Sequence, residues 1–142
     1  MPYQHTQVGY WMFVVSVVLA LAVAARAQSL ATFGVMVLIT TLASTLFGTL
    51  TTIVDGASVA VRFGPIRLIR DRFEVADITS ARVVRNSPLH GIGMRYIPHG
   101  RLWNVWGLDA VELQLRNGTR FRIGTDEPQA LLAALRQSGV PA

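Results

Sequence analysis

The sequence predicts an α+β protein in which a two-helix N-terminal transmembrane hairpin precedes a small β domain closed by one C-terminal helix. Three observations predict this class: residues 1–54 are almost free of charge, the residues after Asp55 alternate between apolar and polar side chains, and a short amphipathic segment ends the chain. Of the 142 residues, 51% are hydrophobic and 15% are charged, whereas soluble domains carry about 25% charged residues. The composition therefore favours a membrane protein.

The charges divide the chain into two parts. Arg26 is the only charged residue before Asp55, and the other arginines and all 8 acidic residues follow it. We therefore expect a transmembrane hairpin over residues 1–54 and a cytoplasmic domain over residues 55–142. The chain has no cysteine, which excludes a disulfide-stapled fold, a thiol nucleophile and a cysteine zinc site.

Two uncharged stretches, residues 8–25 and 30–54, are the expected membrane spans. About 20 apolar residues in a helix cross the roughly 30 Å of hydrocarbon. The four residues between the stretches force the helices to be antiparallel, and Ser29 is placed to cap the second helix. Small residues should mark the helix contact; they are Ser16, Ala20 and Ala24 in the first helix and Thr41, Thr45, Gly48 and Thr52 in the second.

A cleaved signal peptide is the competing interpretation of the first stretch, because Ala25-Arg26-Ala27 has the small-x-small pattern of a cleavage site. The apolar run is longer than usual for such a peptide, and residues 1–7 contain no lysine or arginine. The second stretch would anchor the protein in either case. Because positively charged flanks stay in the cytoplasm and four arginines follow the second stretch closely, we expect a multi-pass protein of a bacterial inner membrane with both termini cytoplasmic.

Seven strands are expected after Asp55, because the periodicity there changes to two. They cover residues 58–63, 66–73, 78–84, 93–97, 102–106, 110–116 and 119–123. The last two strands form a hairpin whose turn contains Asn117-Gly118. A two-residue turn would put arginine on the core side, whereas a three-residue loop over 116–118 pairs Leu113 with Phe121, with Gly118 in the left-handed position of a bulge.

The final segment predicts one amphipathic helix. Asp126 is the expected N-cap, with Gln129 at the spacing of a capping box. The apolar face consists of Leu131, Leu132 and Leu135, and Gly139 ends the helix. We expect this helix to close the open end of a curved, barrel-like sheet, which alone would bury too little apolar surface.

This order of elements resembles that of the bacterial pleckstrin-homology-like membrane proteins. The stretch from Gly100 to Leu113 (GRLWNVWGLDAVEL) and the stretch from Ile123 to Pro128 (IGTDEP) are the most similar to that family's domain. The resemblance implies a pleckstrin-homology-like seven-stranded β-barrel on a membrane anchor, without an established catalytic activity. It implies no ligand-binding residue.

No catalytic or cofactor-binding constellation is found in the sequence. His5, His90 and His99 are scattered without metal-ligand spacing. Gly91-Ile92-Gly93 lacks the third glycine and the acidic partner of a nucleotide site. We therefore predict that the protein is not an enzyme, and that it needs no metal or cofactor.

The arginines and tryptophans are the remaining candidate site residues. Arg62, Arg67, Arg70 and Arg72 are the candidates for contact with anionic lipid at the membrane surface. Arg101, Trp103 and Trp106 are the candidates for a partner patch; the two tryptophans differ in strand parity, so one should be packed and the other exposed. The expected function is an interaction module for a protein or peptide partner, and the alternative is a reader of anionic lipid head groups. Nucleic acid is not an expected partner, since the modest positive charge is interleaved with acidic residues.

Overall fold

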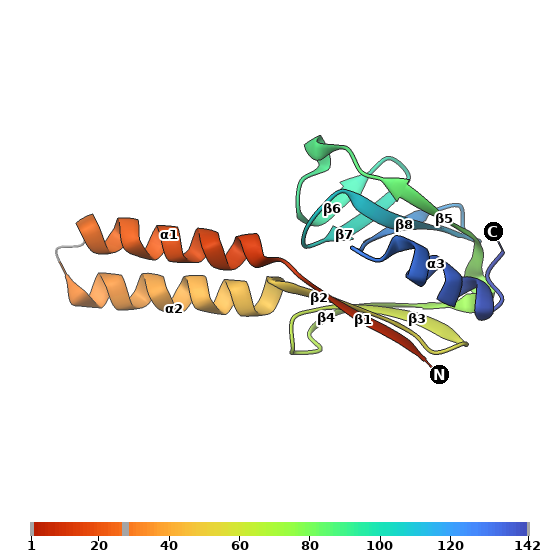
Figure 1. Cartoon of the computed structure of the whole chain (residues 1–142), viewed down its shortest axis with the longest axis horizontal. Coiled ribbons are helices and arrows are strands. Elements are labelled where there is room, and N and C mark those ends of the chain that lie inside the picture. The colour runs from red at the N-terminus through yellow and green to blue at the C-terminus, as the bar shows by residue number, and fades with distance from the viewer. Residues whose placement is uncertain (1, 27–28, 142) are drawn as a thin grey trace.

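The computed structural model describes residues 2–26 and 29–141, and consists of a helical hairpin, two antiparallel-rich β-sheets and a C-terminal helix (Figure 1). The hairpin is formed by α1 (Tyr10–Arg26) and α2 (Leu30–Phe47). It projects as a rod from one end of the sheets, and both chain termini lie at the opposite end.

The expectation of two membrane spans is wrong. Among the described residues, α2, with 18 residues, is the one helix long and apolar enough to cross a membrane, and α1 is a shorter apolar helix of 17 residues. The expected span over 30–54 is also too long: the helix ends at Phe47, where Gly48 donates its N–H to Ser44. The sequence Thr49–Val54 is rich in β-branched residues, which favour strands, and it forms β2.

Inside the hairpin, the helices meet through polar and small side chains. Ser29 caps α2 as expected, accepting from the Thr32 amide. Ser16 lies 2.5 Å from Ser44, hydroxyl to hydroxyl. Ser44 is buried, whereas Thr41 and Thr45 are exposed, so the contact face of α2 is rotated away from the threonine row that the spacing predicted.

The first sheet continues directly from the hairpin. Its strand order is β1-β2-β3-β4, all antiparallel, with β1 at Tyr3–Val8, β2 at Thr49–Val54, β3 at Ser58–Phe63 and β4 at Ile69–Glu74. The strand before α1 pairs with the strand after α2, from Tyr3 opposite Val54 to Val8 opposite Thr49. Gly9 donates to the carbonyl of Gly48 at 2.7 Å, which ties the helix ends together. The sheet and the hairpin are therefore joined by two adjacent chain segments.

The second sheet has the order β5-β8-β9-β7-β6. Its strands are β5 (Ile78–Arg85), β6 (Gly93–Ile97), β7 (Gly100–Asn104), β8 (Asp109–Leu115) and β9 (Arg120–Gly124), and β7 and β9 pair in parallel. Two 3-10 helices, η1 (Val75–Asp77) and η2 (Pro88–His90), lie in the connections. The expected seven-stranded pleckstrin-homology-like barrel is thus wrong: the described residues form nine strands in two sheets, and neither sheet closes.

The core lies between the two sheets, with α3 (Pro128–Gln137) packed on β5 and β8. An aromatic cluster joins the sheets: the ring of Trp103 lies 5.4 Å from that of Phe63 and 5.5 Å from that of Phe121, centroid to centroid. From α3, Leu131 and Leu135 are fully buried in the same core. The helix therefore packs on its predicted apolar face, although it covers one end of a two-sheet core and not a barrel.

The β8–β9 hairpin has the predicted register. Leu113 lies opposite Phe121 and Val111 opposite Ile123. The three-residue loop is also confirmed, since Leu115 accepts from Gly118 and Gly118 has a φ of 85°. A positive φ suits glycine, which has no Cβ to clash.

At the start of α3 the expected cap is wrong. Glu127 occupies the N-cap position without a side-chain hydrogen bond, and Pro128 begins the helix. Asp126 instead bonds to His5 of β1. Gly139, with a φ of 95°, ends the helix as predicted.

Candidate functional site

The four arginines expected at the membrane surface do not form one cluster. Arg62 of β3 and Arg70 of β4 are cross-strand partners and so share one face of the first sheet. Arg67 is exposed in the connection between these strands. Arg72 lies on the same face two pairs further from the hairpin, opposite Ala60, and is 3.9 Å from Asp55 and 3.6 Å from Glu74.

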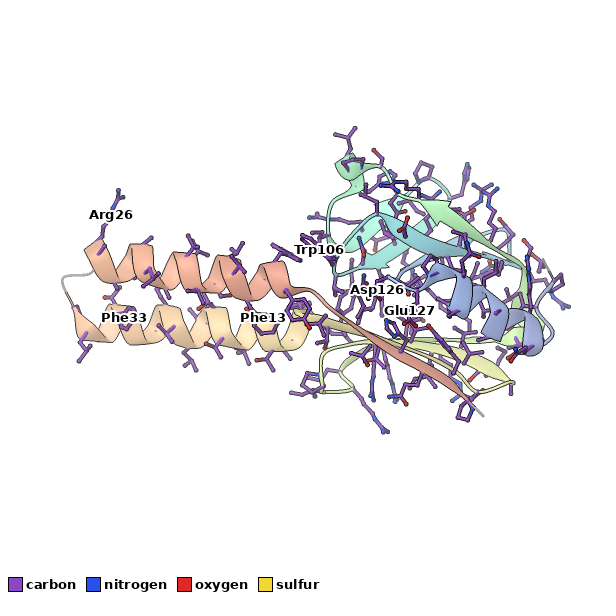
Figure 2. The ribbon with its side chains drawn as sticks, in the orientation of Figure 1. Phe13, Arg26, Phe33, Trp106, Asp126 and Glu127 are labelled. Carbon is purple, nitrogen blue, oxygen red and sulfur yellow. The ribbon has the colours of Figure 1, made fainter. Side chains whose placement is uncertain are left out.

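The expected partner patch is divided between three environments. Trp103 is 5% exposed and belongs to the core, whereas Trp106 is 52% exposed in the β7–β8 connection. Trp106 lies at the end of the sheets that faces the hairpin (Figure 2). Arg101 lies on β7 near the opposite end, so the three residues do not share a surface, although the prediction of one packed and one exposed tryptophan is confirmed.

Arg101 connects the two sheets. Its guanidinium donates to Asp71 of β4 at 2.6 Å and lies 5.4 Å from the centre of the Phe121 ring on β9. The side chain is partly exposed. Arg101 therefore closes the outer end of the aromatic cluster and at the same time presents charge to solvent.

Two open cavities flank Arg101, with volumes of about 620 and 660 Å³. We call them together the Arg101 groove; both are lined by Arg101, Leu115, Asn117 and Thr119. The first is also bordered by the consecutive β4 residues Arg72, Phe73 and Glu74. Successive side chains of a strand point to opposite faces, so a cavity over one face of β4 would be lined by alternate residues only. Three consecutive residues border this cavity, which shows that it lies along the edge of β4.

That edge of β4 has no strand beside it. In an antiparallel pair, the residues that bond to the partner strand alternate with residues that do not. The Val75 amide donates to the carbonyl of Ala57. By this alternation, the backbone groups of Phe73 and Asp71 also form their hydrogen bonds with β3. The backbone groups of Arg72 and Glu74 therefore point to the free edge, and the Arg72 amide donates there to the Asp71 carboxylate at 3.2 Å.

A cluster that the sequence did not indicate lies between β1 and the start of α3. His5 Nε2 is 2.6 Å from Asp126 Oδ1, and His5 Nδ1 is 3.4 Å from Glu127 Oε2; Figure 2 shows both carboxylates beside β1. Burial, together with the negative charges of Glu127 and Asp126, raises the pKa of Tyr3 to about 12. His5 and Asp126 are 121 positions apart, so no local pattern could have revealed the pair.

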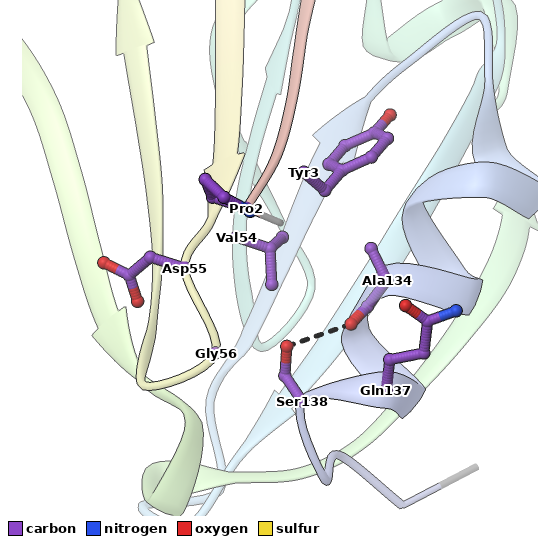
Figure 3. A pocket seen from close by; sticks show the side chains of 8 residues that line it. All are labelled: Pro2, Tyr3, Val54, Asp55, Gly56, Ala134, Gln137 and Ser138. Carbon is purple, nitrogen blue, oxygen red and sulfur yellow. Dashed lines mark hydrogen bonds between the residues drawn. The ribbon is translucent and has the colours of Figure 1, made fainter.

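A third cavity, of about 400 Å³, is lined by residues from near both ends of the chain (Figure 3). Pro2 and Tyr3 line it from one side, and Ala134 and Gln137 of α3, with the C-cap residue Ser138, from another. Asp55 is its one charged lining residue. Hydrogen bonds from Ser58 and Ala57 lower the pKa of Asp55 and occupy its carboxylate, so this cavity offers little chemistry.

Glu112 is the most buried charged side chain of the described residues, and its contacts are those of a stabilising ion-pair group. It is 3% exposed, and its two oxygens accept from Arg82 and Arg122, each at 2.7 Å. Burial alone would raise the pKa of Glu112, but the hydrogen bonds and charges of Arg122 and Arg82 outweigh it and lower the pKa. Within residues 2–26 and 29–141, no group of three histidine or acidic side chains is arranged to hold a metal ion.

The sequence matches no protein-family model, and no curated protein shows significant similarity to it. Neither comparison therefore identifies a pleckstrin-homology-like domain.

Proposed function

We propose that the protein is a non-enzymatic interaction module, anchored in the cytoplasmic membrane through helix α2 of its hairpin, that binds an extended segment of a protein partner. The hairpin exposes large apolar side chains along its length, among them Val17, Leu21, Val35 and Leu38, and lipid is the solvent that favours such a surface. The sheets carry nearly all the arginines, which favours the cytoplasmic side for them.

The free edge of β4 beside the Arg101 groove is the observation that carries the proposed binding mode. An extended peptide can add to an exposed strand edge through main-chain hydrogen bonds, with alternate side chains in neighbouring pockets. The Arg72 and Glu74 backbone groups would supply the main-chain bonds, and the groove would receive the side chains. The Asp71 carboxylate, which now holds the Arg72 amide and Arg101, would have to release that amide.

Site-specific photo-crosslinking of the full-length protein in cells tests this function. A photoreactive residue at Asn117, in the groove, should capture one defined protein, and the same residue at the exposed Ala133 of α3 should not. The variant Arg72→Pro removes the outward amide but keeps the β3–β4 bonds, so it should abolish the capture. Arg72→Gln is the matched control: it loses the charge but keeps the backbone amide, so the partner should still be captured. Equal capture in the proline variant would refute strand addition.

Anionic lipid recognition is the second candidate function. Among the described residues, Arg62, Arg67 and Arg70 have no ion-pair partner within 4.0 Å, and juxtamembrane arginines are attracted by anionic leaflets. Tight binding to anionic but not neutral vesicles by a variant in which a short glycine-serine turn replaces the hairpin between β1 and β2, lost in Arg67→Gln/Arg70→Gln/Arg72→Gln, would favour this function. Equal binding to both vesicles would exclude it.

A further inference from the structure

The sheets have an end that faces the hairpin, and three connections form it. The connection 64–68 begins at Gly64, whose backbone lies against Leu46 of α2. The segment 88–94 ends at Ile92, Gly93 and Met94, which border a cavity of about 280 Å³ together with Trp11, Met12 and Phe47 of the hairpin; the turn η2 at its start lies at the same end of the sheets. The connection 105–108 begins at Val105, which accepts a hydrogen bond from the Trp11 indole. We call these three connections the hairpin-facing rim; Figure 1 shows them at the end of the sheets nearer the hairpin, above, beside and below the hairpin in this view.

Exposed apolar side chains of the sheets are concentrated on this rim. Outside the hairpin, six large apolar side chains of the described residues are strongly exposed, and five of them belong to the rim: Ile66, Leu68, Leu89, Met94 and Trp106. The sixth is Tyr96 of β6. Leu89 is 95% exposed and Leu68 is 77% exposed, values that leave these side chains without packing of their own. Large exposed apolar clusters of this kind mark interaction surfaces.

The surroundings of the rim indicate what covers it. The exposed apolar surface of α1 begins at Tyr10 and Phe13, next to the rim, so the two apolar surfaces are continuous. Arg67 lies between Ile66 and Leu68 in the sequence, and Arg95 follows Met94. Apolar side chains flanked by arginine suit the interface of a bilayer, where the chain enters the lipid and the guanidinium reaches a phosphate. Tryptophan is enriched at the same depth.

We propose that the hairpin-facing rim is a lipid-docking surface, with Ile66, Leu68, Leu89 and Trp106 in the interfacial layer of the bilayer that α2 enters. This inference rests on the proposed membrane anchoring, and not on the proposed partner. It fixes the orientation of the sheets: the rim lies on the lipid, and the Arg101 groove, which includes the β8–β9 loop at the other end, faces the cytoplasm.

Depth-dependent fluorescence quenching tests the docking. Because the chain has no cysteine, single cysteines at Leu68, Leu89, Thr119 and Val35 can each be labelled with an environment-sensitive fluorophore in full-length protein in vesicles. Lipids with a spin label near the head group should quench the labels at Leu68 and Leu89. The negative control is Thr119, which is exposed in the distal β8–β9 loop. The label at Val35 of α2 is probed with lipids that carry the spin label deep in the acyl chain, and its quenching reports whether the protein is anchored in the membrane.

The two proposals fail in different ways. If Val35 is quenched while Leu68 and Leu89 resemble Thr119, the anchoring holds and the docking is wrong. If Val35 is not quenched, the anchoring fails and the docking with it. A further pair of variants keeps the fluorophore at Met94, so that Leu68 and Leu89 need not carry the label. Leu68→Asn/Leu89→Asn should lose most of the quenching. Tyr96→Asn, at an exposed position outside the rim, should keep it. Unchanged quenching in the double variant would overturn the docking.

Discussion

The indole N–H of Trp11, in the first turn of α1, donates a hydrogen bond of 2.6 Å to the carbonyl of Val105, which directly follows β7 of the second sheet. The first sheet is joined to the hairpin through the chain itself, because β1 and β2 continue into α1 and α2. The second sheet has no such covalent connection to the hairpin; this bond and that from the Gln7 side chain to Trp106 tie its β7–β8 connection to the N-terminal segment.

Trp11→Phe should loosen the β7–β8 connection while preserving the fold. The substitution keeps an aromatic ring but leaves the Val105 carbonyl without its donor, which costs about 1 to 3 kcal/mol for a buried group. Amide exchange of residues 105–108 in the reconstituted protein should become faster. Tyr10→Phe is the matched control, since Tyr10 is 73% exposed and its hydroxyl has no hydrogen bond among the described residues. Equal exchange in both variants would show that the bond does not hold the connection.

Glu112→Gln should lower the free energy of unfolding by about 3 kcal/mol, because a neutral amide leaves two arginines without their buried counter-charge. The pKa of Glu112 is lowered by folding, so its contribution is complete above the unfolded-state value of about 4.3 and is lost as the pH falls through the folded-state value. Denaturant unfolding at a series of acidic pH values should therefore show a smaller pH dependence in the variant than in the wild type.

The control for this prediction is Glu74→Gln. Glu74 is 57% exposed and lies 3.6 Å from Arg72, and exposed ion pairs contribute little. If both glutamine variants unfold alike, the buried Arg82–Glu112–Arg122 group does not stabilise the second sheet.

Tyr3 should ionise late in an alkaline titration, because its pKa is raised to about 12. The unfolded-state pKa is about 10, so the neutral phenol stabilises the fold fully below pH 10, and this contribution is lost as the pH rises toward 12. Absorbance of tyrosinate should show a component near pH 12 that is absent in Tyr3→Phe. The Tyr3 hydroxyl is buried without a hydrogen-bond partner among the described residues, so the phenylalanine variant should be at least as stable at neutral pH.

Gly100→Ala should destabilise the second sheet by about 3 kcal/mol or more, the upper range for overpacking. A Cβ at this position would collide with the backbone carbonyl of Arg120, the parallel partner of Gly100, and a backbone atom cannot move aside as a flexible side chain can. Thermal unfolding followed by tryptophan fluorescence measures the loss. Gly34→Ala is the control, because a Cβ there meets nothing within 4 Å. An unchanged melting temperature for Gly100→Ala would contradict the close β7–β9 approach.

Local patterns in the sequence were sufficient for the elements whose partners are near in the chain. The register of Leu113 with Phe121 follows from side-chain alternation and a three-residue loop. The apolar face of α3 follows from the spacing of Leu131, Leu132 and Leu135. The hairpin follows from two apolar stretches and a loop too short for any other arrangement.

The strand β1 could not be predicted in this way. Its inward-facing side chains are Tyr3, His5 and Gln7, so it lacks the apolar alternation by which strands are recognised. Its strand partner, β2, lies across the whole hairpin, and the apolar residues of β2 extended the predicted membrane span to Val54. With both strands assigned elsewhere, seven strands remained, and a barrel was the arrangement that seven strands and a helix suggested.

By itself, the sequence determined that this protein has an apolar helical hairpin, a β domain rich in arginine, and a closing helix, because each depends on residues close together in the chain. The tertiary structure alone decided that nine strands form two sheets, that Trp103 is buried while Trp106 is exposed, and that Arg101 bonds to Asp71. Each of these depends on which distant segment occupies the space beside a strand. Alternation within a strand shows which side chains share a face, but it does not show what that face or the strand's edge will meet.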